Sequence, residues 1–136
     1  MADLSVTTTS VKWVSGPRIR AKGGETVTNG QAVMKKTDGK WYKSDANGAT
    51  NKVDGIVLSG GAVDQEILVQ TGGVIAIGAT VGVGTIYVLS GTAGGIALGA
   101  PGVPDLVSGW TTVIIGVGLT TANIGLLLYN SDVAVP

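Results

Sequence analysis

The stretch from Val81 to Pro101, VGVGTIYVLSGTAGGIALGAP, decides the fold class because it places a β-forming run between clusters of glycine. Residues 85–89 (TIYVL) are β-branched, aromatic or aliphatic, a composition typical of strands. The serine and glycines that follow at residues 90–95 favour turns. A helix through residues 82–95 would contain five glycines, each costing about 0.8 to 1 kcal/mol relative to alanine. The stretch therefore predicts a strand, a turn and a second strand.

The same alternation of short apolar segments and turn residues continues along the chain. We expect further strands at residues 10–14, 31–36, 40–43, 55–59, 65–70, 74–77, 111–119 and 124–129. Asp38-Gly39 and Thr71-Gly72-Gly73 are typical of hairpin turns, and residues 120–123 are expected to join the last two strands. Trp41 and Tyr42 should point to opposite faces, so only one of them is expected in the core. About nine or ten strands at this spacing predict an all-β fold, an antiparallel β-sandwich that is jelly-roll-like, with a small β-barrel as the alternative.

The composition argues against an enzyme. The chain has 136 residues, a length typical of one domain, and it contains 23 glycines but no cysteine and no histidine. Disulfides, thiolate metal sites, cysteine nucleophiles and histidine acid–base chemistry are therefore excluded. The glycine-rich segments complete no phosphate-binding motif, and the carboxylates Asp64 and Glu66 are interpreted as a solvated strand end rather than a calcium site. We expect no catalytic residue, no cofactor and no metal site.

Charge divides the chain into two parts. Residues 1–52 hold nine basic and four acidic residues, a net charge of +5, whereas residues 53–136 hold five acidic residues and no basic one. The densest basic segment is RIRAK at residues 18–22, which in an extended conformation places Arg18, Arg20 and Lys22 on one face. Two interpretations stay open: these cations bind an acidic partner, or they form the solvated face of an edge strand and deter aggregation.

Residues 1–22 are expected to form an extended N-terminal arm and a basic strand, and residues 23–136 a single β domain. The arm is rich in threonine, and its apolar residues Leu4 and Val6 share one face of a period-two pattern. Such an arm is either disordered or ordered by adding a strand to the sheet edge of a neighbouring molecule.

Nucleic acid and membrane are not expected as partners. Trp13, Trp41 and Tyr42 lie among the basic residues, as in a groove where bases stack, but the net charge is zero and the isoelectric point is about 6.1. Two apolar windows, residues 73–89 and 113–129, are long enough to suggest membrane spans. Their glycine content and the absence of any basic residue after Lys52 argue against insertion.

The order of features from residue 24 to residue 128 resembles the capsid decoration (cement) proteins of tailed bacteriophages. The resemblance is carried by Gly24-x-x-Val27-x-x-Gly30-x-Ala32-Val33, Asp45-Ala46, Gly55-Ile56-Val57, Val69, Gly73-Val74, Val81-Gly82-x-x-x-x-Tyr87-Val88-Leu89, Gly94-Gly95-Ile96 and Ile115-Gly116-Val117. These are mainly glycines and valines in register, and the first twenty or so residues lie outside them.

The resemblance implies a non-enzymatic structural protein on the exterior of the virion capsid. It would bind the outer surface of an icosahedral head, cement neighbouring major capsid subunits and form a symmetric homo-oligomer, either a dimer or a trimer. Within that expectation, we assign capsid binding to Leu4, Val6, Trp13, Arg18, Arg20 and Lys22. Two alternatives stay open: a β-structured module of a phage fibre or tail that binds a glycan, and a small membrane protein that uses the two apolar windows.

Overall fold

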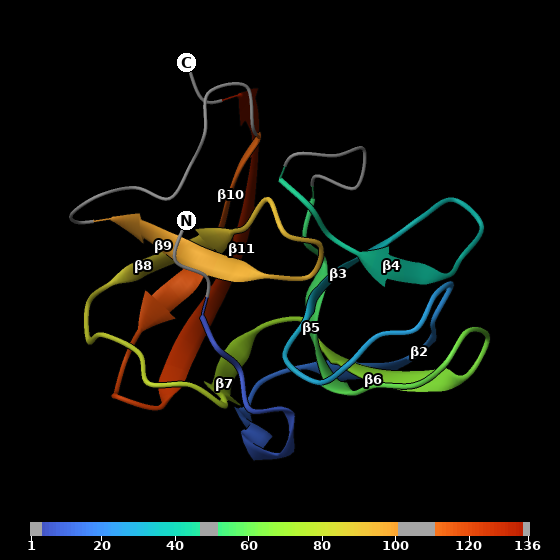
Figure 1. Cartoon of the computed structure of the whole chain (residues 1–136), viewed down its shortest axis with the longest axis horizontal. Coiled ribbons are helices and arrows are strands. Elements are labelled where there is room, and N and C mark those ends of the chain that lie inside the picture. The colour runs from blue at the N-terminus through green and yellow to red at the C-terminus, as the bar shows by residue number, and fades with distance from the viewer. Residues whose placement is uncertain (1–3, 47–51, 101–110, 135–136) are drawn as a thin grey trace.

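The chain folds as a β-sandwich. A computed structural model describes residues 4–46, 52–100 and 111–134, and in it two antiparallel sheets pack on each other without closing into a barrel (Figure 1). The predicted all-β, antiparallel sandwich is therefore confirmed, and the barrel alternative is not the fold adopted.

The strands divide unequally between the sheets. The larger sheet has six strands in the order β1 (Val11–Ser15), β7 (Gly73–Ile77), β11 (Asn123–Ala134), β10 (Thr111–Gly118), β8 (Ile86–Leu89) and β9 (Ile96–Ala100). The smaller sheet has five, in the order β2 (Arg18–Lys22), β6 (Glu66–Gln70), β5 (Gly55–Ser59), β3 (Ala32–Lys35) and β4 (Trp41–Lys43). A short 3₁₀ helix, η1 (Thr8–Ser10), precedes β1.

Local turn chemistry predicted three hairpins correctly. β8 pairs with β9 across the glycine-rich turn, where Gly94 has a φ of +77° and Ser90 N–H donates to the carbonyl of Gly95. β3 pairs with β4 across Asp38-Gly39, and β10 pairs with β11. Trp41 is buried while Tyr42 is only partly so, as their alternation predicted.

The predicted hairpin between residues 65–70 and 74–77 is wrong. β6 pairs with β2 and β5 in the smaller sheet, whereas β7 pairs with β1 and β11 in the larger one, so residues 71–73 carry the chain between the sheets. The physical reason lies at Gly73, which has a φ of +75° and passes so close to the β1–β2 connection that an added Cβ would lie 2.3 Å from the carbonyl oxygen of Ser15. Glycine is needed here for a crossover, not for a two-strand turn.

Alternating residues of the smaller sheet belong to two separate cores. Ile56 and Leu58 of β5 face the larger sheet and join the main cluster, which includes Ile75 and Ile124. Between them in sequence, Val57 faces the opposite way and joins a second cluster. The members of that second cluster are Val27, Val33, Trp41, Val57, Ile67 and Val69. The smaller sheet is therefore apolar on both faces, because residues 24–30 and Trp41 cover the face turned away from its partner sheet.

Candidate functional site

The best candidate site is the corner where the chain crosses from β1 to β2. Each of these strands is an edge strand of its own sheet, and Gly16-Pro17 joins them. Gly16 has a φ of +104°. The carbonyl of Pro17 accepts a 3.0 Å hydrogen bond from Thr71 N–H, which links the β1–β2 crossover to the β6–β7 crossover. We call Trp13, Arg18, Arg20 and Lys22 the basic corner.

An aromatic–cation pair forms the centre of the basic corner. The Trp13 indole Nε1–H donates a 3.0 Å hydrogen bond to the carbonyl of Gly16, which fixes the ring relative to the crossover. The Arg18 guanidinium lies 4.2 Å from the centroid of that ring. An exposed pair of this kind is worth about 0.5 to 1 kcal/mol. Trp13 is 42% exposed, so its flat apolar ring and the Arg18 charge beside it are accessible from solvent.

The remaining cations extend along β2. Arg18, Arg20 and Lys22 pair in register with Gln70, Leu68 and Glu66 of β6, so the three cations share one face of the strand as predicted. Arg18 and Arg20 border a shallow groove of about 530 Å³, whose other lining residues are Ser59, Glu66, Ile67 and Leu68. Ser59 and Leu68 are neighbours of the cations that the sequence did not predict, because no local pattern indicates which strands pair.

The charge of Arg20 is available to a partner. Its Nε lies 4.0 Å from Glu66 Oε1, and the two side chains are 80% and 68% exposed. An ion pair that long and that exposed contributes little to stability, because solvent screens it. The apolar surface beside the cations is the ring of Trp13, since Ile19 lies on the opposite face of β2. The corner therefore offers charge and apolar contact together, as protein interfaces require.

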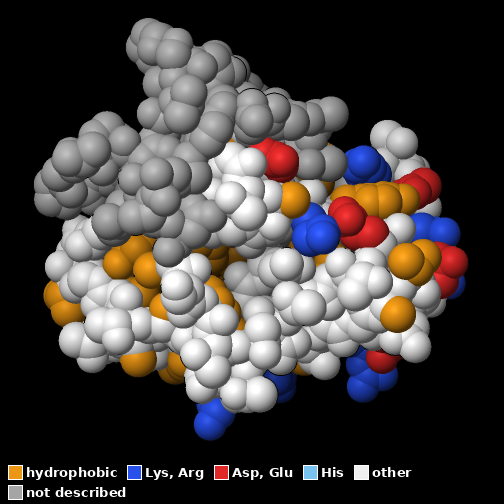
Figure 2. All heavy atoms as spheres, in the orientation of Figure 1, with side chains coloured by type: hydrophobic (Ala, Val, Ile, Leu, Met, Phe, Trp, Pro, Cys, Tyr) orange, Lys and Arg blue, Asp and Glu red, His pale blue; other side chains and the backbone are white. Residues whose placement is uncertain are grey.

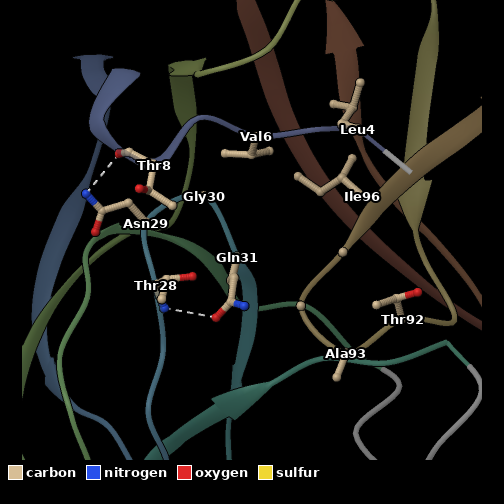
Figure 3. Close-up of a pocket in the computed structure, with 12 residues that line it drawn as sticks. Leu4, Val6, Thr8, Thr28, Asn29, Gly30, Gln31, Thr92, Ala93 and Ile96 are labelled. Atoms are coloured by element: carbon tan, nitrogen blue, oxygen red, sulfur yellow. Dashed lines mark hydrogen bonds between the residues drawn. The ribbon is translucent and has the colours of Figure 1, made fainter. Parts of the chain in front are cut away.

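Leu4 and Val6 do not join the basic corner. The segment that contains them lies along its own sandwich, with Leu4 and Val6 near Ile96 (Figure 3). Leu4 N–H donates to the carbonyl of Ile96 and Thr7 N–H to that of Gly78, both at 2.8 Å. Both apolar side chains are partly buried against the main core. Val6 also packs tightly on Gly30, where an added Cβ would lie 2.6 Å from its Cγ1.

A hollow of about 260 Å³ opens beside this segment. Leu4, Val6 and Ile96 form its apolar wall, and Thr28, Asn29 and Gln31 line the other side (Figure 3). The polar groups are already engaged in the fold, since Gln31 Oε1 accepts from Thr28 N–H at 2.9 Å and Asn29 Nδ2 donates to the carbonyl of Thr8 at 3.2 Å. We therefore interpret the hollow as a seam where the N-terminal segment docks.

A second charged cluster lies at the tip of the β3–β4 hairpin. Tyr42 O–H donates a 2.6 Å hydrogen bond to Asp38, which lowers the pKa of that carboxyl and raises the pKa of the phenol. Lys40 Nζ lies 2.8 Å from Asp64 Oδ1, and this contact lowers the pKa of Asp64 and raises that of Lys40. Asp64 thus pairs with a lysine, which agrees with its interpretation as a solvated strand end rather than half of a calcium site.

Within residues 4–46, 52–100 and 111–134, no three or more Asp, Glu, His or Cys side chains gather as they would around a metal ion. In the same part of the chain, no helix has the length and apolar character needed to cross a membrane.

Comparison with protein-family models, with curated proteins and with solved structures finds no match for this chain. The resemblance to phage decoration proteins therefore stays a prediction from the sequence.

Proposed function

We propose that the chain is a structural protein of a phage virion, which binds the outer surface of the icosahedral head and cements neighbouring major capsid subunits. The observation that carries the proposal is the basic corner, an exposed Trp13–Arg18 pair extended by Arg20 and Lys22 along the edge strand β2. Such a surface suits carboxylates on a partner protein, because guanidinium groups bind them through charge-assisted hydrogen bonds.

A protein partner fits this surface better than nucleic acid. The overall net charge is zero, so the chain lacks the excess of positive charge that phosphate binding needs. Trp and Arg are also the residue types that most often dominate the binding energy of protein interfaces. The resemblance noted in the sequence names the head subunit as that protein.

Cementing requires only modest contacts. The four residues of the basic corner are far fewer than the roughly 20 to 30 residues that each partner contributes to a standard interface, so a single copy on its own would bind weakly. A small oligomer that contacts several head subunits at once converts weak contacts into strong attachment, because each later contact is intramolecular. The repeated lattice of a head supplies those contacts at every equivalent position.

Co-sedimentation tests the proposal. The purified chain is mixed with heads of the phage that encodes it, assembled without it, and the pellet is compared with the supernatant over a range of concentrations. We expect saturable binding at a fixed ratio to the major capsid protein, weakening as salt is raised because exposed charges contribute.

A matched pair of variants connects binding to the corner. Lys36 lies 4.3 Å from the Tyr42 ring, so Lys36→Ala removes a cation–π pair of nearly the same geometry as Arg18→Ala does, but at the β3–β4 hairpin. Arg18→Ala should weaken head binding about 5- to 30-fold, as expected for the loss of about 1 to 2 kcal/mol at a central interface residue. Lys36→Ala should leave head binding unchanged.

Absence of binding by the unaltered chain, or binding to tail fibres in place of heads, would overturn the proposal and favour the fibre module.

A further inference from the structure

Hydrogen bonds at both ends of β2 show which of its residues face β6. At one end, the carbonyl of Pro17 accepts from Thr71 N–H at 3.0 Å. At the other end, Gly23 N–H donates to the carbonyl of Gln65 at 3.1 Å. Both pairs continue the antiparallel register of the two strands, and in such a ladder hydrogen-bonded and non-hydrogen-bonded pairs alternate. Every second residue from Pro17 to Gly23 therefore bonds to β6.

The residues between these direct their backbone N–H and C=O groups away from β6. They are Arg18, Arg20 and Lys22, the same three residues that carry the cations of the strand. Among the residues that the structure describes, no strand lies on that side of β2, whose neighbour in the sheet is β6 (Figure 1). Next to Lys22 the edge is closed, because Gly23 forms an isolated bridge with Trp41. The open part of the edge is therefore the backbone of Arg18 and Arg20.

The other edge strands are covered or interrupted. The chain that follows β2 meets the outer side of β4, where Gly24 N–H donates to the carbonyl of Trp41. In the same place, the carboxylate of Glu25 accepts from Lys43 N–H. Leu4 N–H donates to the carbonyl of the first residue of β9, and a register shift interrupts β1. Within the described part of the chain, β2 differs from these strands in offering a regular edge without a covering segment.

Charge decides what this edge accepts. Figure 2 shows that charged side chains gather mainly on the right, over the five-stranded sheet to which β2 belongs. Two copies of β2 would bring like charges together, so the edge resists pairing with itself. A strand with carboxylates opposite Arg18 and Arg20 would instead gain charge-assisted contacts. Arg20 has only a long, exposed contact with Glu66 at 4.0 Å, and Arg18 stacks on Trp13, so both can still bind a carboxylate.

The residue between the two carboxylates should be apolar. Ile19 is 41% exposed on the face of β2 opposite the cations. In an added antiparallel strand, the residue opposite Ile19 belongs to a non-hydrogen-bonded pair, in which side chains lie close together. A β-branched residue at that position would cover the exposed isoleucine. The edge therefore matches an extended segment with the pattern acidic, apolar, acidic.

We infer that β2 accepts such a segment of a partner protein as an added antiparallel strand, with carboxylates opposite Arg18 and Arg20. The backbone groups of the edge supply affinity, and the cations select an acidic partner. The inference rests on the proposed function in one respect, namely that the basic corner binds a protein. It does not require that this protein be a capsid subunit.

Backbone-methylated peptides test the inference. The probe is a synthetic peptide in which Glu-Val-Glu is flanked by serine and threonine, and its binding to the purified chain is followed by NMR of the backbone amides. In the inferred pairing, the glutamate N–H groups point toward β2 and the valine N–H points away. Methylating one glutamate nitrogen should weaken binding about 10-fold or more, because a donor is lost and the methyl group meets the edge. Methylating the valine nitrogen, which leaves charge and side chains the same, should leave binding unchanged.

Amide hydrogen exchange provides a second readout. With the unmethylated peptide at about nine times its dissociation constant, exchange at Arg18 and Arg20 should slow about 10-fold, because only the free chain exchanges. Exchange at Ile19 and Ala21, which already bond to β6, should change less. Arg20→Glu should weaken peptide binding about 10-fold or more, because like charges then face each other. Lys36→Glu, at the β3–β4 hairpin, should leave peptide binding unchanged.

Two results would overturn the inference: equal binding by the two methylated peptides, or no binding of the unmethylated peptide at about 1 mM. The outcome is separable from that of the head-binding experiment. Head binding by a chain that does not bind the peptide would refute strand addition and leave the cementing role standing. Peptide binding with the expected dependence on methylation, by a chain that does not bind heads, would support strand addition and refute cementing.

Discussion

Gln70 is expected to hold the two crossovers between the sheets together. It is fully buried at the end of β6, and its Nε2 donates to the carbonyls of Ser15, Gly72 and Val74 at 2.8, 2.7 and 2.9 Å. Ser15 ends β1, while Gly72 and Val74 belong to the passage from β6 to β7. The side chain therefore joins the links through which the chain changes sheet. We predict that Gln70→Leu destabilises the fold without altering its topology.

The size of the effect follows from these contacts. The Nε2 amide has two hydrogens, which the three carbonyls share. Losing two hydrogen bonds whose buried acceptors are left without a donor, at about 1.5 kcal/mol each, lowers the free energy of unfolding by about 3 kcal/mol. Part of this lost stability is offset, because Gln70 Oε1 is buried without a hydrogen-bond partner and removing it raises the free energy of unfolding by about 1 kcal/mol. The net loss is about 2 kcal/mol, which for a domain of this length lowers Tm by roughly 6 °C.

Urea unfolding followed by circular dichroism measures this loss. Gln65→Leu is the matched control, because Gln65 is exposed and its Oε1 accepts a 2.9 Å hydrogen bond from Ala62 N–H. The control should change the free energy of unfolding by less than about 1 kcal/mol. A Gln70→Leu variant as stable as the unaltered chain, within about 0.5 kcal/mol, would refute the role assigned to the three contacts.

Two further predictions concern single positions. Gly73→Ala should lower the free energy of unfolding by more than about 2 kcal/mol in the same urea assay, because the new Cβ meets the Ser15 carbonyl. Gly39→Ala, which has a similar φ of +82° but no atom within 4 Å of the new Cβ, should cost only about 1 kcal/mol; equal losses at both positions would contradict this explanation. Asp64→Asn removes the carboxylate that Lys40 stabilises. Because the folded pKa of Asp64 lies below its ordinary value, the unaltered chain should be the more stable at pH 7, and its advantage should vanish as the pH falls below about 4; an advantage independent of pH would exclude the ion pair as its source.

The sequence predicted features that depend on neighbours along the chain. Asp38-Gly39 specifies a tight turn through its own backbone preferences, so the β3–β4 hairpin could be located without knowledge of the rest. The same holds for the alternation that buries Trp41 and leaves Tyr42 partly exposed, and for the cations that share one face of β2.

Features that depend on distant pairing could not be predicted. Thr71-Gly72-Gly73 has the composition of a hairpin turn, but its glycines serve a close passage against Ser15, which is more than fifty residues away in sequence. Gln70 looks like an ordinary polar strand end until its three carbonyl partners are placed around it. Likewise, the alternation of Leu4 and Val6 indicated an apolar face, but not that this face docks on the chain's own core.

Image reconstruction of heads with and without the chain would locate it on the virion. We expect added density on the outer surface of the decorated heads, spanning the boundaries between neighbouring capsid subunits at equivalent positions, with the basic corner against the capsid. Identical reconstructions with and without the chain, or added density on the tail alone, would contradict the proposed cementing role.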